Sequence, residues 1–243
     1  MRITDRDFDL MTYLAAQGVA TSNQLASRFF GSRGSCRLRL SALMKRGIVE
    51  SLPLQTLMRH KMTAFLDSMD IFSTRRLDPS RYKVYRLTER FRHRRLGSDA
   101  MADEVMWKHQ IQLNGVRTYF EDLFPGALML NDPEVRREWE RFPGGREAVI
   151  PDIVIRDGGH QVAVEVERNL KNETAYFARF LSYRDSTYTH VLYFCETEKI
   201  FKSVSGLAAR FEKIGVSSLL SKERIYQAAH GFISTRQFLG LNN

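Results

Sequence analysis

Residues 151–167, PDIVIRDGGHQVAVEVE, decide the fold of the second half of the chain. The apolar runs Ile153–Ile155 and Ala163–Val166 have the length and composition of buried β-strands. Between them, Asp157-Gly158-Gly159 supplies residues that tolerate the backbone angles of a tight turn. The stretch therefore predicts a β-hairpin, and it places acidic residues at the open end of that hairpin.

Three carboxylates, Asp152, Glu165 and Glu167, lie at this open end. With Gly158-Gly159 as a two-residue loop, Asp152 faces Glu165, and Glu167 projects from the same side of its strand. A one-residue shift of the turn preserves this cluster, whereas a loop one residue longer would break it. Because like charges repel and carboxylate oxygens suit Mg²⁺ or Mn²⁺, we expect the three acids to bind such a metal. The alternative is an edge hairpin whose acids face water.

The residues around the hairpin predict alternating helices and strands. Helices are expected over 99–123, 169–185 and 203–214, and strands over 127–130, 189–195 and within 224–233. Residues 133–148 are polar and are expected to be irregular. The order strand, helix, strand after Glu165 predicts that strand 189–195 runs parallel to the Glu165 strand. The second half of the chain thus predicts a mixed sheet with helices.

The net positive charge of the chain comes entirely from its first part. The formal net charge is +9, and residues 1–95 contain 19 Lys and Arg against 8 Asp and Glu. Residues 96–243 contain 18 against 20. Such an asymmetry predicts a module that binds a polyanion, joined to a module of another kind. The alternative is a basic surface that only keeps the protein soluble.

The first 97 residues predict three short helices followed by two strands. Helices are expected over 4–17, 21–30 and 32–46, and strands over 48–52 and 83–88. Thr4 and Asp7 match a capping box, and Gly18 and Gly47 are suited to end the first and third helices. The apolar residues that recur at helical spacing are Phe8, Leu10, Met11, Leu14, Ala15, Leu25, Phe29, Phe30, Cys36, Leu40, Leu43 and Met44.

Three helices followed by a two-stranded wing resemble the winged helix-turn-helix family, in which the third helix enters the major groove of DNA. Arg33 and Arg37 in that helix are four residues apart and therefore project from the same face. The residues expected to contact DNA are Arg33, Arg37, Arg39, Lys45 and Arg46. The alternative is a helix face that only carries solvated charge.

Two segments of the first module are not assigned to a helix or strand with certainty. The insert 54–81 is long for a wing loop, which indicates a functional or mobile segment. The basic run 90–98, RFRHRRLGS, either follows a phosphate backbone or serves as a charged linker. We place the domain boundary close to Gly97, so that residues 1–97 form the winged-helix domain and residues 98–243 the second domain.

Pro151-Asp152 followed by Glu165-x-Glu167 resembles the PD-(D/E)xK superfamily of restriction-endonuclease-like nucleases. The resemblance implies an α+β or α/β domain, a mixed sheet flanked by helices, with metal held by Asp152 and Glu165. The last motif position is usually Lys, which helps to activate the attacking water, and this chain has Glu167 there. Lys171, four residues later, is the candidate for the missing positive charge.

Nearly the whole chain resembles the replication-relaxation family, which includes the MobC-type relaxases of mobilisable plasmids. The resemblance is carried by the N-terminal helices, the strand Tyr85-x-Leu87-Thr88, a helix bearing His109, and the acidic motif before a helix with Lys and Tyr. It implies binding of double-stranded DNA at a plasmid transfer origin, nicking of one strand, and an accessory mobilisation or coupling protein. The catalytic residues that it implies are His109, Asp152, Glu165, Glu167, Lys171 and Tyr183.

Two of these residues have a structural alternative, because His109 and Tyr183 both lie among apolar side chains of a helix. A relaxase with a Tyr nucleophile forms a covalent link to DNA. The six His residues of this chain are scattered and offer no cluster to hold metal beside such a Tyr. We therefore expect hydrolysis rather than covalent transfer.

Other features narrow the class of protein. Cys36 and Cys195 match no metal spacing, which favours a reducing cytoplasm. No apolar run is long enough to span a bilayer and the N-terminus lacks a secretory signal, so no membrane insertion is expected. The competing hypothesis is a non-enzymatic DNA-binding regulator of replication or transcription, whose second domain would be an inactive nuclease-like fold.

Overall fold

Residues 151–167 form the predicted hairpin in the computed structural model of the protein. Strand β5 (Ile153–Asp157) pairs antiparallel with β6 (His160–Glu167), and Asp157 lies opposite His160. The loop is therefore Gly158-Gly159, as predicted. Gly158 has a φ of 54°, a left-handed conformation that favours glycine.

The structure describes residues 3–53, 83–89, 91, 104–140, 149–219, 221–227 and 229–241. The predicted insert 54–81, Gly97 and all but Phe91 of the basic run 90–98 lie outside the described residues. The chain forms two compact units, residues 1–115 and 116–243. This division falls within helix α6 (Glu104–Leu123), further along the chain than the boundary near Gly97 that we predicted.

The described N-terminal residues confirm the predicted helices and strands. They form α1 (Asp5–Gln17), α2 (Ser22–Phe29) and α3 (Arg33–Lys45), and a three-stranded antiparallel sheet in the order β1 (Ala20–Thr21), β3 (Lys83–Leu87) and β2 (Val49–Pro53). The predicted capping box is present, because Asp7 Oδ2 accepts a hydrogen bond from Thr4 N at 2.7 Å. One apolar prediction was wrong: Phe8 is 47% exposed, since the buried face of α1 is centred on Leu10 and Leu14.

The first part of α6 belongs to this N-terminal unit because its polar side chains and backbone bond to the preceding elements. Asn114, which is fully buried, donates from Nδ2 to the carbonyl oxygen of Val19 at 2.7 Å. Gln24 on α2 donates from Nε2 to the carbonyl oxygen of Ile111 at 3.0 Å. Buried amide groups require such partners, and these bonds explain why the unit extends past Gly97.

The described residues of the second unit form a seven-stranded mixed sheet. Its order is β10 (Gly231–Ser234), β9 (Arg224–Gln227), β8 (Ile214–Ser218), β7 (His190–Cys195), β6, β5 and β4 (Leu128–Asn131). Strands β6, β7 and β8 are parallel, and the remaining pairs are antiparallel. The predicted parallel pairing of β6 with β7 and the α+β architecture are therefore confirmed.

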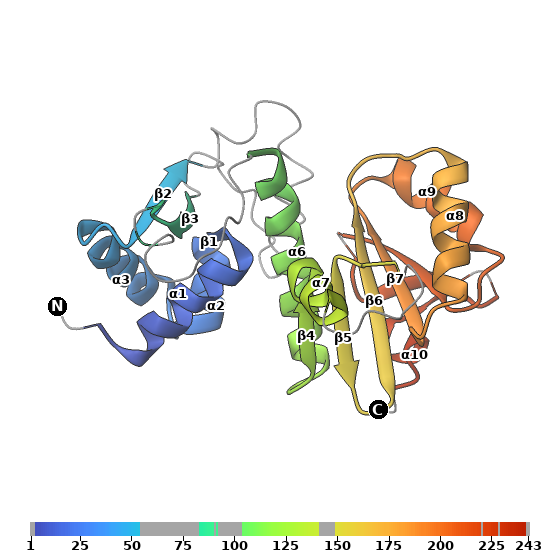
Figure 1. Cartoon of the computed structure of the whole chain (residues 1–243), viewed down its shortest axis with the longest axis horizontal. Helices are drawn as coiled ribbons and strands as arrows, with labels where there is room; N and C mark the ends of the chain where they lie inside the picture. The colour runs from blue at the N-terminus through green and yellow to red at the C-terminus, as the bar shows by residue number, and fades with distance from the viewer. Residues whose placement is uncertain are drawn as a thin grey trace. The chain divides into compact units, whose positions relative to one another are not determined.

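Helices cover both faces of this sheet. α8 (Glu173–Arg184) and α9 (Glu198–Ala208) connect the parallel strands and lie side by side on one face (Figure 1). On the other face, Phe120 of α6 packs edge-to-face against Phe194 of β7, with ring centroids 5.9 Å apart. The short helix α10 (Thr235–Phe238) packs there too, since Phe238 contacts the ring of His190.

The structure corrects three predictions in this unit. Residues 132–140, expected to be irregular, form helix α7 (Asp132–Glu140), because Asn131 and Glu134 cap each other's backbone N–H groups at 3.1 and 2.8 Å. The helix predicted over 203–214 is α9, Glu198–Ala208; it starts earlier because Thr197 Oγ1 accepts the N–H of Ile200, and residue 214 already belongs to β8. The C-terminal residues form the β9–β10 hairpin, where one strand was expected.

Gly215 on β8 provides a stability prediction. A Cβ atom there would meet Ile225 Cγ2, and would lie 2.9 Å from Phe238 Cζ and 3.1 Å from Leu192 Cδ2. We expect Gly215→Ala to cost about 1–3 kcal/mol of unfolding free energy, measured by urea denaturation, because overpacking displaces its neighbours.

Gly206 on α9 is the matched control, since a Cβ there meets nothing within 4 Å. Gly206→Ala should raise the unfolding free energy by up to about 1 kcal/mol, because Ala is a better helix former than Gly. Equal effects of the two substitutions would contradict the packing described at Gly215.

Candidate functional site

The hairpin register brings Asp152 beside β6. Ile153 lies opposite Val164, so Asp152, one residue before β5, is level with Glu165. Asp152 Oδ2 accepts a hydrogen bond from the backbone N–H of Val166 at 2.7 Å. The Asp152 side chain thus extends the β5–β6 ladder just before β5 begins, and this bond fixes its carboxylate beside β6.

Glu165 is 5% exposed, and two residues donate hydrogen bonds to one of its carboxylate oxygens. Arg179 Nε donates to Glu165 Oε1 at 2.9 Å, Arg179 Nη2 donates to the same atom, and so does the hydroxyl of Tyr183. No hydrogen bond from the described residues reaches the other oxygen, Oε2. Glu165 is therefore held firmly through one oxygen only.

The pKa of Glu165 is raised to about 7. Burial is the largest cause, since it disfavours the charged form, and the nearby negative charge of Asp152 adds to it. Arg179 and Tyr183 act in the opposite direction because they stabilise the carboxylate. This effect agrees with the hairpin register, which places Asp152 level with Glu165.

Glu167 lies on the same face of β6 and is 4% exposed. Lys171 Nζ donates to Glu167 Oε1 at 2.5 Å, and the hydroxyl of Tyr176 donates to Oε2 at 3.5 Å. Burial, together with Glu167, raises the pKa of Tyr176 to about 12. The Lys171 side chain is half-exposed, so its ammonium reaches the carboxylate from the solvent side.

Helix α8 supplies the partners of both glutamates. Asn172 caps its first turn by accepting the N–H of Ala175 at 2.7 Å. Tyr176, Arg179 and Tyr183 follow at spacings of three and four, so they share the face that covers β6. Tyr176 and Arg179 were not among the predicted site residues. Their spacing from Tyr183 is a signal that could have identified them, because it places the Arg179 cation on the same helix face as two aromatic residues.

Tyr183, which the family resemblance implied as a catalytic residue, lies in a setting that limits its chemistry. Tyr183 is fully buried, its hydroxyl donates to Glu165, and burial together with the charge of Glu165 raises its pKa far above the usual range. A Tyr in that position supports Glu165 and does not present a nucleophile to solvent. His109 is half-buried on α6 and belongs to the first unit, whereas the carboxylates belong to the second.

The carboxylates fit a hard divalent cation in their donor chemistry, because Mg²⁺ and Mn²⁺ prefer carboxylate oxygens. The candidate ligands are Glu165 Oε2, to which no described residue donates, and the carboxylate of Asp152, which lies level with Glu165 in the hairpin. Glu167 forms an ion pair with Lys171. Of the three expected ligands, Asp152 and Glu165 are therefore the two that remain as candidates. Within the described ranges, no group of three His, Cys, Asp or Glu side chains is arranged to hold a metal ion.

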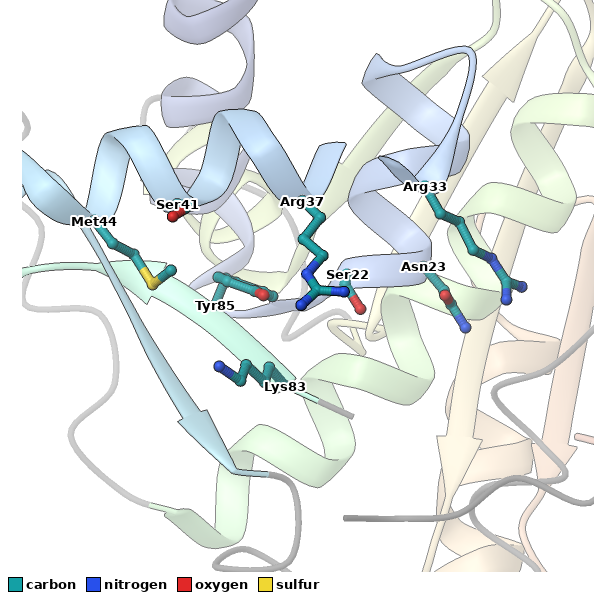
Figure 2. A pocket seen from close by; sticks show the side chains of 8 residues that line it. All are labelled: Ser22, Asn23, Arg33, Arg37, Ser41, Met44, Lys83 and Tyr85. Carbon is teal, nitrogen blue, oxygen red and sulfur yellow. The ribbon is translucent and has the colours of Figure 1, made fainter. Parts of the chain in front are cut away.

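The first unit carries a basic hollow of about 560 Å³ between α2, α3 and β3. Figure 2 shows Arg33 and Arg37 reaching into it from α3 and Lys83 from β3. The remaining lining residues are Ser22, Asn23, Ser41, Met44 and Tyr85. The hollow combines exposed cations with neutral hydrogen-bonding side chains, which are the groups that contact phosphates and base edges.

The other cations predicted to contact DNA are placed differently. Arg39 forms an ion pair with the buried carboxylate of Asp7, and its Nε donates to Asp7 Oδ1 at 2.6 Å. Burial would raise the pKa of Asp7, but hydrogen bonds from Arg39 and Thr4 outweigh it and hold the pKa at about 2. Arg39 therefore stabilises the fold. Lys45 and Arg46 lie exposed at the C-terminal end of α3.

In comparisons with protein-family models, curated proteins and solved structures, nothing matches this chain. Among the described residues, no helix has both the length and the apolar character needed to cross a membrane.

The Asp7–Arg39 ion pair predicts a specific pH dependence of stability. Because the folded pKa of Asp7 is about 2 and its ordinary value is 3.8, the pair stabilises the fold above about pH 4 and loses this effect as the pH falls toward 2. Asp7→Asn should therefore cost about 2 kcal/mol at pH 7 and roughly half of that at pH 3, measured by urea denaturation.

Asp9→Asn serves as the control, because Asp9 is exposed on the same helix. A difference between wild type and Asp7→Asn that is the same at pH 7 and pH 3 would contradict the assignment.

Proposed function

We propose that this protein binds double-stranded DNA through its first unit and nicks one strand through a metal-dependent site in its second unit. The observation that carries the proposal is the placement of Asp152 level with the buried Glu165, with Glu165 Oε2 left without a donor from the described residues. Metal-dependent cleavage of a phosphodiester fits the acidic motif. The excess of positive charge in residues 1–95 supports DNA as the substrate.

The order of elements in the first unit supports a winged helix-turn-helix. Helix α3 follows α2 after a short turn, and the β2–β3 pair would be the wing. Arg33, Arg37 and Lys83 line one hollow, so a DNA backbone would meet three positive charges together. Such contacts release counterions and supply affinity that depends on salt.

In the proposed site, Asp152 and Glu165 would hold Mg²⁺ or Mn²⁺. When bound, such an ion supplies Lewis-acid polarisation of a phosphodiester. Arg179 and Tyr183 bind Glu165 Oε1, so they favour its ionised form and orient the carboxylate. Lys171 brings an ammonium group to Glu167, which supports its proposed role as the cation of the motif.

The proposed reaction is hydrolysis. A water oxygen bonds to phosphorus, one P–O ester bond breaks, and the departing oxygen takes a proton, which leaves one hydroxyl end and one phosphate end. The burial of Tyr183 supports this route over a covalent tyrosyl intermediate. By the family resemblance, the DNA would be a plasmid transfer origin, and an accessory mobilisation or coupling protein would be the partner.

A specific observation favours a second candidate, a non-enzymatic DNA-binding regulator of replication or transcription. Glu165 and Glu167 are each paired with a cation of the chain itself, Arg179 and Lys171. Such pairing relieves the repulsion between the acids without metal. In this case the second unit would contact partners, and the protein would bind DNA without cutting it.

The nicking activity is tested with isosteric variants of the two proposed ligands. Wild type with Mn²⁺ should convert supercoiled plasmid carrying the transfer origin to open circles, and Asp152→Asn and Glu165→Gln should each lower the rate at least a hundredfold. The neutral side chains keep the shape and lose the charge that holds a metal. Retained DNA binding, followed by fluorescence anisotropy, shows that the first unit is intact, and an unchanged urea unfolding midpoint shows that the second unit is folded.

Glu173→Gln is the control, since Glu173 is an exposed acid in the first turn of α8. Undiminished nicking by the two ligand variants would refute the site. Wild type that binds the origin but never nicks it would favour the regulator.

The DNA-binding surface is tested at Arg37. Arg37→Ala should weaken duplex binding several-fold and lower the slope of log K against log salt by about 1, because one phosphate contact is lost. Arg136→Ala is the control, since Arg136 is an exposed cation of α7 that pairs with Asp132. An unchanged salt slope for Arg37→Ala would count against α3 as the contact helix.

A further inference from the structure

Arg179 is the residue that connects the two proposed ligands. Its Nε donates to Glu165 Oε1 at 2.9 Å, and its Nη2 donates both to that oxygen and to the carbonyl oxygen of Ile150, the latter at 2.9 Å. Ile150 lies two residues before Asp152. One guanidinium therefore ties the segment that carries Asp152 to the side chain of Glu165.

We propose that Arg179 is a positioning residue that sets the affinity of the Asp152–Glu165 pair for a divalent cation. The proposal rests on the proposed function, because it assumes that this pair holds metal. Arg179 would act by fixing the separation and orientation of the two carboxylates before the ion arrives. Ligands that are already in place bind a metal more tightly, since no ordering cost remains to be met at binding.

Arg179 could instead act as a replacement for the metal, that is, as a cation that occupies the place of the ion. Its contacts favour positioning over replacement. A cation that only stood in for the ion would neutralise whichever oxygens the ion uses. Arg179 and Tyr183 instead share Glu165 Oε1 and leave Oε2 without a donor from the described residues. In addition, the bond to Ile150 O neutralises no charge, and its effect is to hold the chain before Asp152.

A guanidinium is needed for this arrangement. It is planar and presents several N–H donors at fixed angles, so it can bridge a carboxylate and a carbonyl oxygen at once. The ammonium of a lysine is a compact charge on a flexible stem and cannot reproduce that bridge. Arg179→Lys therefore preserves the positive charge next to Glu165 and removes the geometric link to Ile150.

Binding of Mn²⁺ to the folded protein separates the two roles. Mn²⁺ affinity is measured by electron paramagnetic resonance of the free ion, on the full chain without DNA and well below the melting temperature. Positioning predicts that Arg179→Lys weakens Mn²⁺ binding at least tenfold and reduces the rise in melting temperature that Mn²⁺ produces, because that rise follows affinity. Replacement predicts an unchanged Mn²⁺ affinity for Arg179→Lys, because the lysine keeps the competing positive charge next to Glu165.

Two further variants complete the experiment. Tyr183→Phe removes one donor to Glu165 and leaves the Ile150 link intact, so it should weaken Mn²⁺ binding less than Arg179→Lys. Arg184→Lys is the matched control, because Arg184 is an exposed cation on the same helix that pairs with Asp185, and it should leave the affinity unchanged. If Arg179→Lys does not fold, Arg179→Gln replaces it, since its amide can reach only one of the two acceptors.

The outcomes separate this inference from the proposed function. Wild type that binds Mn²⁺, together with an Arg179→Lys variant of equal or higher affinity, overturns the positioning role and leaves the metal site standing. Wild type that binds no Mn²⁺ overturns both.

Discussion

The buried ion pair between Glu165 and Arg179 is the interaction on which the second unit depends. A carboxylate in the middle of a mixed sheet costs several kcal/mol unless a partner compensates it. Arg179 supplies that partner from α8, and Tyr183 adds a second donor to the same oxygen. Removing either member of the pair would leave an uncompensated charge among Phe180, Tyr193 and the rest of the core under α8.

This constraint links the fold to the candidate chemistry. Because α8 is the crossover between parallel strands β6 and β7, its buried face must lie over β6, and its cation meets Glu165 there. The same guanidinium reaches back to Ile150 and holds the start of the hairpin. The hydrogen bonds of Arg179 to Glu165 and to Ile150 therefore hold together the segments that carry Asp152, Glu165 and Arg179. Such rigidity suits the proposed metal site, because binding sites are most effective when their ligands are already fixed.

The sequence predicted what depends on neighbouring residues. The Gly158-Gly159 loop, the resulting register and the capping box of α1 are local signals, and each is confirmed. Partners that are distant in sequence were beyond such reasoning. Arg39 was expected to contact DNA, and it pairs with Asp7. The cation of the chain that compensates Glu165 is Arg179. Both pairs depend on tertiary packing. Helix α7 is a different case, because the Asn131–Glu134 capping box that starts it is a local sequence signal that would have predicted a helix.

The central claim is that Asp152 and Glu165 together hold a divalent cation. The most direct measurement is the crystal structure of the protein soaked in Mn²⁺, with anomalous differences collected to locate the ion. The account predicts one strong peak within coordination distance of Glu165 Oε2 and an Asp152 oxygen, with Arg179 still bonded to Glu165 Oε1 and Ile150 O. A peak elsewhere only, or none at a Mn²⁺ concentration that supports nicking, would contradict it.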